Sequence, residues 1–174
     1  WSNEWYDAFK KGTVATQFSG AWLQGALQNW MAPDTKGLWR VQNLPEKGFA
    51  SWGGSFYAVP SKAKNKQWAW EFIKFMTLNQ GSQITAFKDN GAFPALIAAQ
   101  KDKAFSEPVE FLGGQKARVL WRDAAAKTRP IDVNKYDSIA DQILQTELTN
   151  VPEQGKDVKQ ALADARAQIA RRAR

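Results

Sequence analysis

The stretch SWGGSFYAVPSKAKNKQWAWEFIKFMT, residues 51–77, decides how the chain folds, because a strand pattern passes into a helix pattern within it. Gly53 and Gly54 open the predicted strand 51–60. Its two faces alternate, with Phe56, Ala58 and Pro60 on one and Tyr57 and Val59 on the other. A strand that is apolar on both faces is covered on both faces. We therefore predict that residues 51–60 form a strand inside a sheet.

The second part of the stretch predicts a helix over residues 66–78. Its apolar side chains recur at helical spacing and form one wide stripe: Trp68, Phe72, Ile73, Phe75 and Met76. Such a stripe is typical of a helix that packs on a sheet. Trp68 and Trp70 point in diverging directions because two residues are about 200° apart on a helix. We expect Trp68 in the core and Trp70 partly exposed.

Two further segments fit strands, and the remaining periodic segments fit helices. The predicted strands, besides 51–60, are 13–20 and 38–45. The predicted helices are 3–11, 22–31, 66–78, 82–90, 94–101, 114–127, 136–149 and 155–172. Three strands in separated places are few for a sheet that supports so many helices. We therefore expect a helix-rich α/β protein whose fold is incomplete within this chain.

The composition narrows the possible functions. The 174 residues include no cysteine and no histidine, which excludes thiol nucleophiles, histidine-based triads and almost every zinc site. The net charge of +7 suggests a nucleic-acid partner, but much of it lies near the end of the last predicted helix, at Arg166, Arg171, Arg172 and Arg174. Cations there complement the helix dipole. We expect no cofactor, no metal and no nucleic acid, with a basic, Trp-rich nucleic-acid-binding domain as the alternative.

Trp22 and Trp52 stand out among the nine tryptophans because each lies near a glycine at the end of a predicted element. A glycine lets a ligand approach the backbone. An indole face beside a sugar ring gains roughly 0.5–1.5 kcal/mol beyond burial. We predict that Trp22 and Trp52 bind a carbohydrate, and an ordinary place in the core is the alternative. The pair Gly53 and Gly54 is either a bend in a strand or the entrance of a strand that crosses between lobes.

Glycoside hydrolysis is a weaker alternative. It needs two carboxylates that face one cleft at a defined separation. The available acids are Glu71, Glu107, Glu110, Asp123 and Asp132, and the sequence pairs no two of them. Glu71 lies opposite the apolar stripe of its helix, where a solvated carboxylate is expected. We predict no catalytic residue and no enzymatic activity.

Four segments in a fixed order carry a resemblance to a known family. They are FKKGTVATQFSGAW (9–22), LPEKGFASWGGSFYAVPSKAKNKQWAWEFIKFMT (44–77), GAFPA (91–95) and VKQALADARAQI (158–169). Together they resemble the C-terminal half of family 1 extracellular solute-binding proteins, the maltose-binding-protein-like receptors of bacterial ABC importers. The strongest parts are the strand and Gly-x-Trp that end at Trp22, and the Gly-Gly-x-x-x-Ala-Val strand followed by the Trp-Glu-Phe-Ile-Lys-Phe helix.

The resemblance implies a periplasmic-binding-protein type II-like two-lobed fold, incomplete here because the chain corresponds to the C-terminal portion. In that family two α/β lobes joined by crossing strands close over a solute. The resemblance further implies that Trp22 stacks on the sugar and that Trp52, Gly53 and Gly54 lie at the cleft near the hinge. It adds Tyr136 as another ligand-binding aromatic residue.

The same resemblance implies a division into lobes and a set of partners. Residues 1–48 and 110–174 would belong to the C-terminal lobe, 49–54 would cross the hinge, and 55–109 would return to the N-terminal lobe. A missing N-terminal part of the same protein would complete both lobes. The protein would bind a di- or oligosaccharide and deliver it to the permease subunits of an ABC transporter. It would act in the periplasm or outside the cell, lipid-anchored or free, and residues 1–12 show no signal segment.

Overall fold

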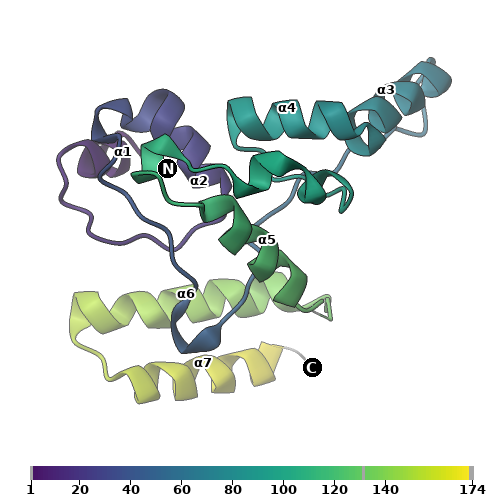
Figure 1. Cartoon of the computed structure of the whole chain (residues 1–174). Coiled ribbons are helices and arrows are strands. Elements are labelled where there is room, and N and C mark those ends of the chain that lie inside the picture. Colours follow the sequence, from purple (N-terminus) through teal and green to yellow (C-terminus); the bar gives the residue numbers. More distant parts are fainter. Residues whose placement is uncertain (1, 131, 173–174) are drawn as a thin grey trace. The chain divides into compact units, whose positions relative to one another are not determined.

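A computed structural model describes residues 2–130 and 132–172, and helices dominate it (Figure 1). The α-helices are α1 (Asn3–Lys10), α2 (Trp22–Ala26), α3 (Lys66–Leu78), α4 (Gln80–Asn90), α5 (Ala117–Lys127), α6 (Asp137–Gln154) and α7 (Val158–Arg172). A π-helical turn, Leu27–Met31, continues α2. Short 3-10 turns lie at Pro33–Thr35, Pro45–Lys47, Ala99–Lys101, Lys103–Ser106 and Glu110–Leu112. None of the helices in the described residues is both long and apolar enough to cross a membrane.

Most predicted helices are confirmed, with ends set by the expected caps. The Asn79 side chain accepts a hydrogen bond from the Ser82 N–H at 2.9 Å at the start of α4, and Gly91 ends α4 with a φ of 71°. The predicted helix 94–101 is wrong, because only the 3-10 turn Ala99–Lys101 forms there. The Gln100 side chain donates to the Pro94 carbonyl at 2.9 Å and so occupies an acceptor that an α-helix would have used.

The three predicted strands are wrong, since segments 13–20, 38–45 and 51–60 form no ladder. In residues 2–130 and 132–172 the single β-type pairing is an isolated bridge between Val109 and Gln115. A strand needs hydrogen-bonded neighbours, and these segments find no partner strand within the described part of the chain.

The chain divides into two compact units, one up to Arg129 and the other from Pro130 onward. The first unit has a core built from α1, α2, the π-helical turn and the segment before α5. Its buried members are Phe9, Leu23, Leu27, Met31, Ala32, Val109, Phe111, Leu112 and Ala117. Two glycines let α2 meet the end of α4, because a Cβ on Gly25 would lie 2.5 Å from the Asn90 carbonyl oxygen and 3.1 Å from the Cα of Gly91.

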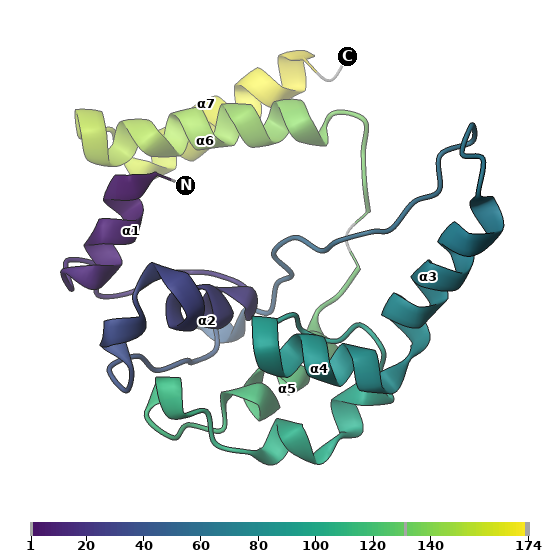
Figure 2. The same ribbon diagram turned by 90° about the horizontal axis from the view of Figure 1, so that it is seen from above.

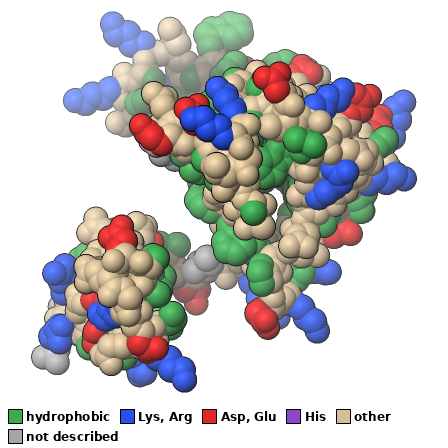
Figure 3. Space-filling view, turned by 90° about the vertical axis from the view of Figure 1, so that its left-hand side faces the viewer, with side chains coloured by type: hydrophobic (Ala, Val, Ile, Leu, Met, Phe, Trp, Pro, Cys, Tyr) green, Lys and Arg blue, Asp and Glu red, His purple; other side chains and the backbone are tan. Residues whose placement is uncertain are grey.

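Helix α3 projects from the rest of the first unit and has no buried residue (Figure 2). The prediction that Trp68 lies in the core is wrong, since 76% of this residue is exposed. Trp70 is 54% exposed, as predicted. The apolar stripe of α3 lacks the sheet that it would cover, because the strands do not form. Figure 3 shows hydrophobic side chains that reach the surface between charged ones.

The second unit is a hairpin of α6 and α7, which lie side by side and antiparallel (Figures 1 and 2). Ala161 and Ala165 of α7 are buried, which lets the two helices pack closely. Glu147 of α6 is also buried, and it accepts hydrogen bonds from Lys156 and Gln168. A buried carboxylate is costly unless it is paired and hydrogen-bonded. These bonds satisfy that requirement.

Candidate functional site

Two of the predicted site residues meet at Gly20, just before α2. A Cβ on Gly20 would lie 2.9 Å from both Cδ1 and Nε1 of the Trp22 indole and 3.6 Å from the Trp52 carbonyl oxygen. Trp22 is half-buried and packs against the core cluster of the first unit. The structure therefore brings Trp22 and the backbone of Trp52 together, although they are far apart in the sequence.

The Trp52 side chain lines a cavity of about 230 Å³ together with Ser2, Trp5 and Gln17. Trp52 is 55% exposed, so much of its ring faces solvent. Trp5 lies on α1, where its ring meets Phe9 edge to face with centroids 4.8 Å apart. The Gln17 side chain donates to the Phe18 carbonyl at 2.8 Å. The cavity thus combines two indoles with an amide and a hydroxyl group.

Three of these lining residues have no counterpart among the predicted site residues. The helical spacing of Trp5 and Phe9 indicates only a helix, and nothing in the pattern separates a core ring from a ring beside a cavity. Ser2 is the N-cap of α1, where its hydroxyl accepts from the Trp5 N–H at 3.3 Å. Gln17 lies in a predicted strand that does not form. No local signal in the sequence marks these residues.

Gly53 and Gly54 follow Trp52 with φ values of 76° and 153°. Residues with a side chain rarely adopt these values. A Cβ at either glycine would meet nothing within 4 Å. The pair is therefore a bend in open surroundings.

Tyr136 belongs to the second unit, directly before α6. It is partly buried, and the Lys135 Nζ lies 4.8 Å from the centroid of its ring. Its backbone N–H donates to the Asn134 side chain at 3.0 Å. The residues that line the Trp52 cavity all belong to the first unit.

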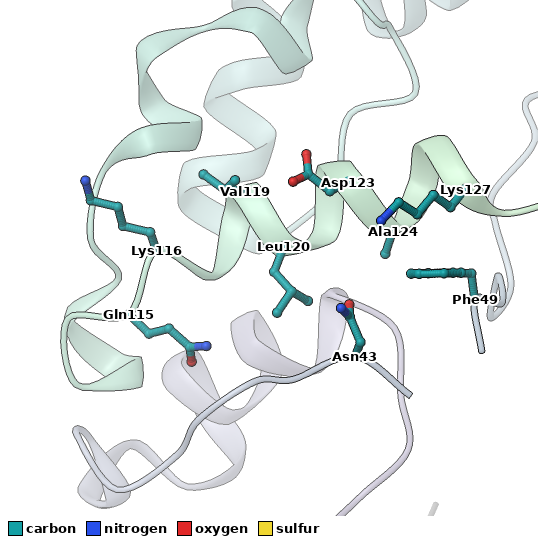
Figure 4. Close-up of a pocket in the computed structure, with 9 residues that line it drawn as sticks. All are labelled: Asn43, Phe49, Gln115, Lys116, Val119, Leu120, Asp123, Ala124 and Lys127. Carbon is teal, nitrogen blue, oxygen red and sulfur yellow. The ribbon is translucent and has the colours of Figure 1, made fainter. Parts of the chain in front are cut away.

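A larger cavity of about 480 Å³ lies between α5 and the segment before Ala50 (Figure 4). Its lining residues are Asn43, Phe49, Gln115, Lys116, Val119, Leu120, Asp123, Ala124 and Lys127. Phe49 precedes Trp52 by three residues, so one short segment contributes an aromatic side chain to each cavity. The predicted site includes no residue of this larger cavity.

In the described residues no group of three or more His, Cys, Asp or Glu side chains is placed to hold a metal ion. No charged residue that the structure describes lines the Trp52 cavity, and its polar lining residues, Ser2 and Gln17, have uncharged side chains. Such groups exchange hydrogen bonds with a neutral hydroxylated molecule, while an indole face covers its apolar side. This chemistry favours a neutral polar ligand with apolar faces.

Known proteins support the predicted fold. A family model described as "Bacterial extracellular solute-binding protein" matches residues 1–113. A lactose-binding protein of Rhizobium radiobacter is 26% identical over 134 residues, which cover 71% of this chain and 30% of that protein. The fold class is thereby confirmed as an incomplete, helix-rich form of the solute-binding-protein fold.

A solved structure of another protein is similar to this one over almost the whole chain. It is described as the ABC transporter associated binding protein from B. animalis subsp. lactis Bl-04 in complex with beta-1,6-galactobiose. The TM-score is 0.77 at 26% identity, and the match covers 97% of this chain and 44% of that chain. This chain therefore spans less than half the length of either relative.

Proposed function

The chain belongs to the bacterial extracellular solute-binding proteins, and on that basis we propose that it is part of a receptor that binds a carbohydrate for an ABC transporter. The relatives support this proposal, because one is a lactose-binding protein and the other was solved with beta-1,6-galactobiose. The solute would be a di- or oligosaccharide. Its recipient would be the permease subunits of the transporter.

The observation that carries the proposal is the cavity lined by Trp5 and Trp52. Trp52 is 55% exposed, and apolar surface exposed to water costs free energy. A sugar ring stacked on the indole would remove part of that surface from water. Gln17 and Ser2 supply an amide and a hydroxyl at the same cavity. We assign Trp52 a stacking role at this cavity, and we propose that Trp22, partly buried beside Gly20, also stacks on the sugar. Gly53 and Gly54 add no side chain to the segment that follows Trp52, and we propose that they let a ligand approach its backbone.

Binding would serve transport, with no bond made or broken. In a two-lobed receptor the solute contacts both lobes only in the closed state, so binding shifts the hinge equilibrium towards closure. The permease would read that closed state. Micromolar affinity corresponds to about 8 kcal/mol, which stacked rings and a few hydrogen bonds in a cleft can supply. The protein would act in the periplasm or outside the cell.

We also propose the division into lobes that the family implies. Residues 1–48 and 110–174 would belong to one lobe, 49–54 to the hinge crossing and 55–109 to the other lobe, completed by an N-terminal part. The exposed aromatic stripe of α3 supports this arrangement, because such a stripe needs a sheet to cover. Hydroxyl-radical footprinting tests it. Trp68 and Phe72 should oxidise less in the protein purified from its native cell than in the 174-residue chain, and equal oxidation would contradict the proposal.

A thermal-shift screen of the chain against sugars tests the proposed function. A ligand that binds only the native state raises stability by about 2.7 kcal/mol at a concentration of 100 times its Kd. Lactose and beta-1,6-galactobiose are the first two sugars to test, with inositol and a short DNA oligonucleotide as controls. We expect at least one sugar to raise the Tm and neither control to do so. A Tm that moves with the oligonucleotide alone would contradict carbohydrate binding.

A further inference from the structure

A basic segment precedes α3 and lines neither of the two cavities. Its sequence is SKAKNK, residues 61–66, in which Lys62, Lys64 and Lys66 alternate with uncharged residues. All three lysines are exposed. Helix α3 projects from the rest of the first unit, and this segment, the basic tip, forms its outer end (Figure 2). The first unit therefore presents three positive charges together on a convex end.

The charge of the basic tip is not neutralised by any carboxylate that the structure describes. Between Glu46 and Asp89 the sequence contains a single acidic residue, Glu71. The Glu71 carboxylate pairs with Lys74 at 2.8 Å, further along α3. The ion pairs of residues 2–130 and 132–172 include no lysine of the basic tip. Its positive potential is therefore available to an anionic partner.

The lysines of the basic tip do not stabilise α3. Lys66 is the first residue of the helix, and the rest of the tip precedes it, at the positive end of the helix dipole. Cations are unfavourable at that end, in contrast to Arg171 and Arg172 in the last turn of α7. The position of the lysines thus favours a role outside the helix.

Trp70 adds an exposed aromatic ring beside the basic tip. It follows Lys66 at i,i+4 spacing, so the two side chains share one face of α3. Trp70 is 54% exposed. It lies about 200° from Trp68 around the helix axis, so a sheet on the Trp68 side would leave Trp70 uncovered. Positive charge and an indole therefore meet on one exposed surface.

This combination of side chains matches the surface of an anionic lipid bilayer. A lysine near such a surface contributes about fivefold in affinity, which corresponds to about 1 kcal/mol. Tryptophan is enriched at the level of the lipid headgroups, where its ring is partly in water and partly in the apolar layer. A convex tip can touch a plane, whereas a peptide segment is usually held in a groove. The observations therefore favour a lipid surface over an acidic segment of another protein.

We propose that the basic tip and Trp70 bind the headgroups of an anionic membrane surface, such as one rich in phosphatidylglycerol. The lysines attract the lipid phosphates, and Trp70 enters the headgroup layer beside them. The contact is weak and reversible, since even one acyl chain gives only marginal membrane binding. It goes beyond the proposed function, because it needs no sugar. In a receptor for an ABC transporter, it would keep the protein close to the membrane that holds the permease.

Co-sedimentation of the unaltered chain with lipid vesicles tests the proposal. Vesicles of phosphatidylglycerol and phosphatidylcholine in equal parts should bind it about fivefold or more tightly than vesicles of phosphatidylcholine alone. Raising the salt concentration from about 0.1 M to 1 M should remove the difference, because the Debye length falls from about 10 Å to about 3 Å. Equal binding to both kinds of vesicle would indicate adsorption through the aromatic stripe of α3 and would overturn the proposal. Absence of binding to the anionic vesicles would overturn it too.

Lysine variants locate the contact on the chain. A triple variant of the tip should bind the anionic vesicles roughly tenfold or more weakly than the unaltered chain: Lys62→Gln, Lys64→Gln and Lys66→Gln. A control triple removes the same charge at exposed lysines elsewhere in the first unit and should change binding by about twofold or less: Lys88→Gln, Lys101→Gln and Lys103→Gln. Equal losses in the two triples would show that only the net charge matters, and the tip would have no special role.

A tryptophan pair tests the aromatic part of the contact. Trp70→Ala should weaken binding to the anionic vesicles by about threefold or more, because the indole surface adds to the affinity. Trp30→Ala is the matched control, since Trp30 is 58% exposed and lies away from α3 on the π-helical turn. Equal binding by the two variants would remove Trp70 from the proposed contact.

Two further outcomes separate the proposal from its alternatives. A poly-glutamate peptide that binds the chain while the anionic vesicles do not would replace the membrane by an acidic protein segment. Vesicle binding by a chain that binds no sugar would reject the proposed function and leave the membrane contact standing. Sugar binding without vesicle binding would reject the membrane contact alone.

Discussion

The Trp22 indole lies directly against Gly20, so closely that a Cβ on residue 20 would come within 2.9 Å of its Cδ1 and Nε1. The ring fills the space that any other residue at position 20 would need. The Trp52 carbonyl oxygen borders the same space at 3.6 Å. Gly20 thus couples the start of α2 to the segment that carries Trp52.

Gly20→Ala should therefore displace the Trp22 ring or the Trp52 backbone. Overpacking of this kind costs about 1–3 kcal/mol. We expect a loss of that size in the free energy of unfolding, measured with urea and tryptophan fluorescence, together with weaker sugar binding. Gly81→Ala is the comparison variant. Its added Cβ would lie 3.3 Å from the Asn79 Oδ1, a looser contact than the 2.9 Å at Gly20. Equal stability of the two variants would show that the ring can move at no cost.

The double hydrogen bond between Gln115 and Val41 gives a second prediction. Gln115→Leu removes both bonds and leaves the backbone N–H and carbonyl of the partly buried Val41 without this partner. Unsatisfied groups cost about 1–3 kcal/mol. We expect a lower free energy of unfolding and faster hydrogen exchange at the Val41 amide. Gln42→Leu, at an exposed neighbouring residue, should change neither, and unchanged exchange in Gln115→Leu would refute the prediction.

The helices follow from the sequence because their signals are local. The stripe from Trp68 to Met76 predicts α3 with its observed bounds, since capping and periodicity act within a few residues. The strands do not follow, because a strand exists only when a distant segment pairs with it. Trp68 is exposed for the same reason: its stripe indicates an apolar face, but not whether this chain supplies the surface that covers it.

The candidate site could also be predicted only in part from the sequence. Trp22 and Trp52 could be singled out from their neighbouring glycines, and the structure places the Trp22 ring and the Trp52 carbonyl beside Gly20. Their role as ligand-binding residues remains a prediction, as does that of Gly53, Gly54 and Tyr136. Trp5 and Gln17 could not be found from the sequence, because only the folded chain brings them beside Trp52.

The acid stability of the second unit should depend on Asp164. Hydrogen bonds from Lys156 and Gln160 hold the pKa of Asp164 below its ordinary value. A group with a lowered folded pKa adds stability above its unfolded pKa, near 4, and loses it as the pH falls through the folded pKa. We expect α6 and α7 to lose stability below about pH 4. Urea unfolding followed by circular dichroism should show that the free energy of unfolding falls over this pH range. The fall should be smaller in Asp164→Asn and unchanged in Asp141→Asn.

The alkaline stability of the same unit should depend on Lys156. Hydrogen bonds to Asp164 and Glu147 raise the pKa of Lys156. Its contribution is complete below the unfolded pKa, near 10.4, and is lost as the pH rises through the higher folded pKa. In urea unfolding at increasing pH, Lys156→Met should remove this loss of stability at alkaline pH, whereas Lys159→Met, at an exposed residue of α7, should keep it. A loss that persists in Lys156→Met would show that another group causes it.

The most direct measurement is calorimetry of Trp52→Ala against Trp70→Ala, with the sugar that gives the largest thermal shift. The two residues are 55% and 54% exposed, so truncation should affect folding similarly, but only Trp52 lines a cavity with Trp5 and Gln17. Carbohydrate stacking predicts that Trp52→Ala raises the Kd at least tenfold, about 1.4 kcal/mol, while Trp70→Ala leaves it unchanged. Equal affinities in the two variants and the unaltered chain would contradict a sugar site at Trp52.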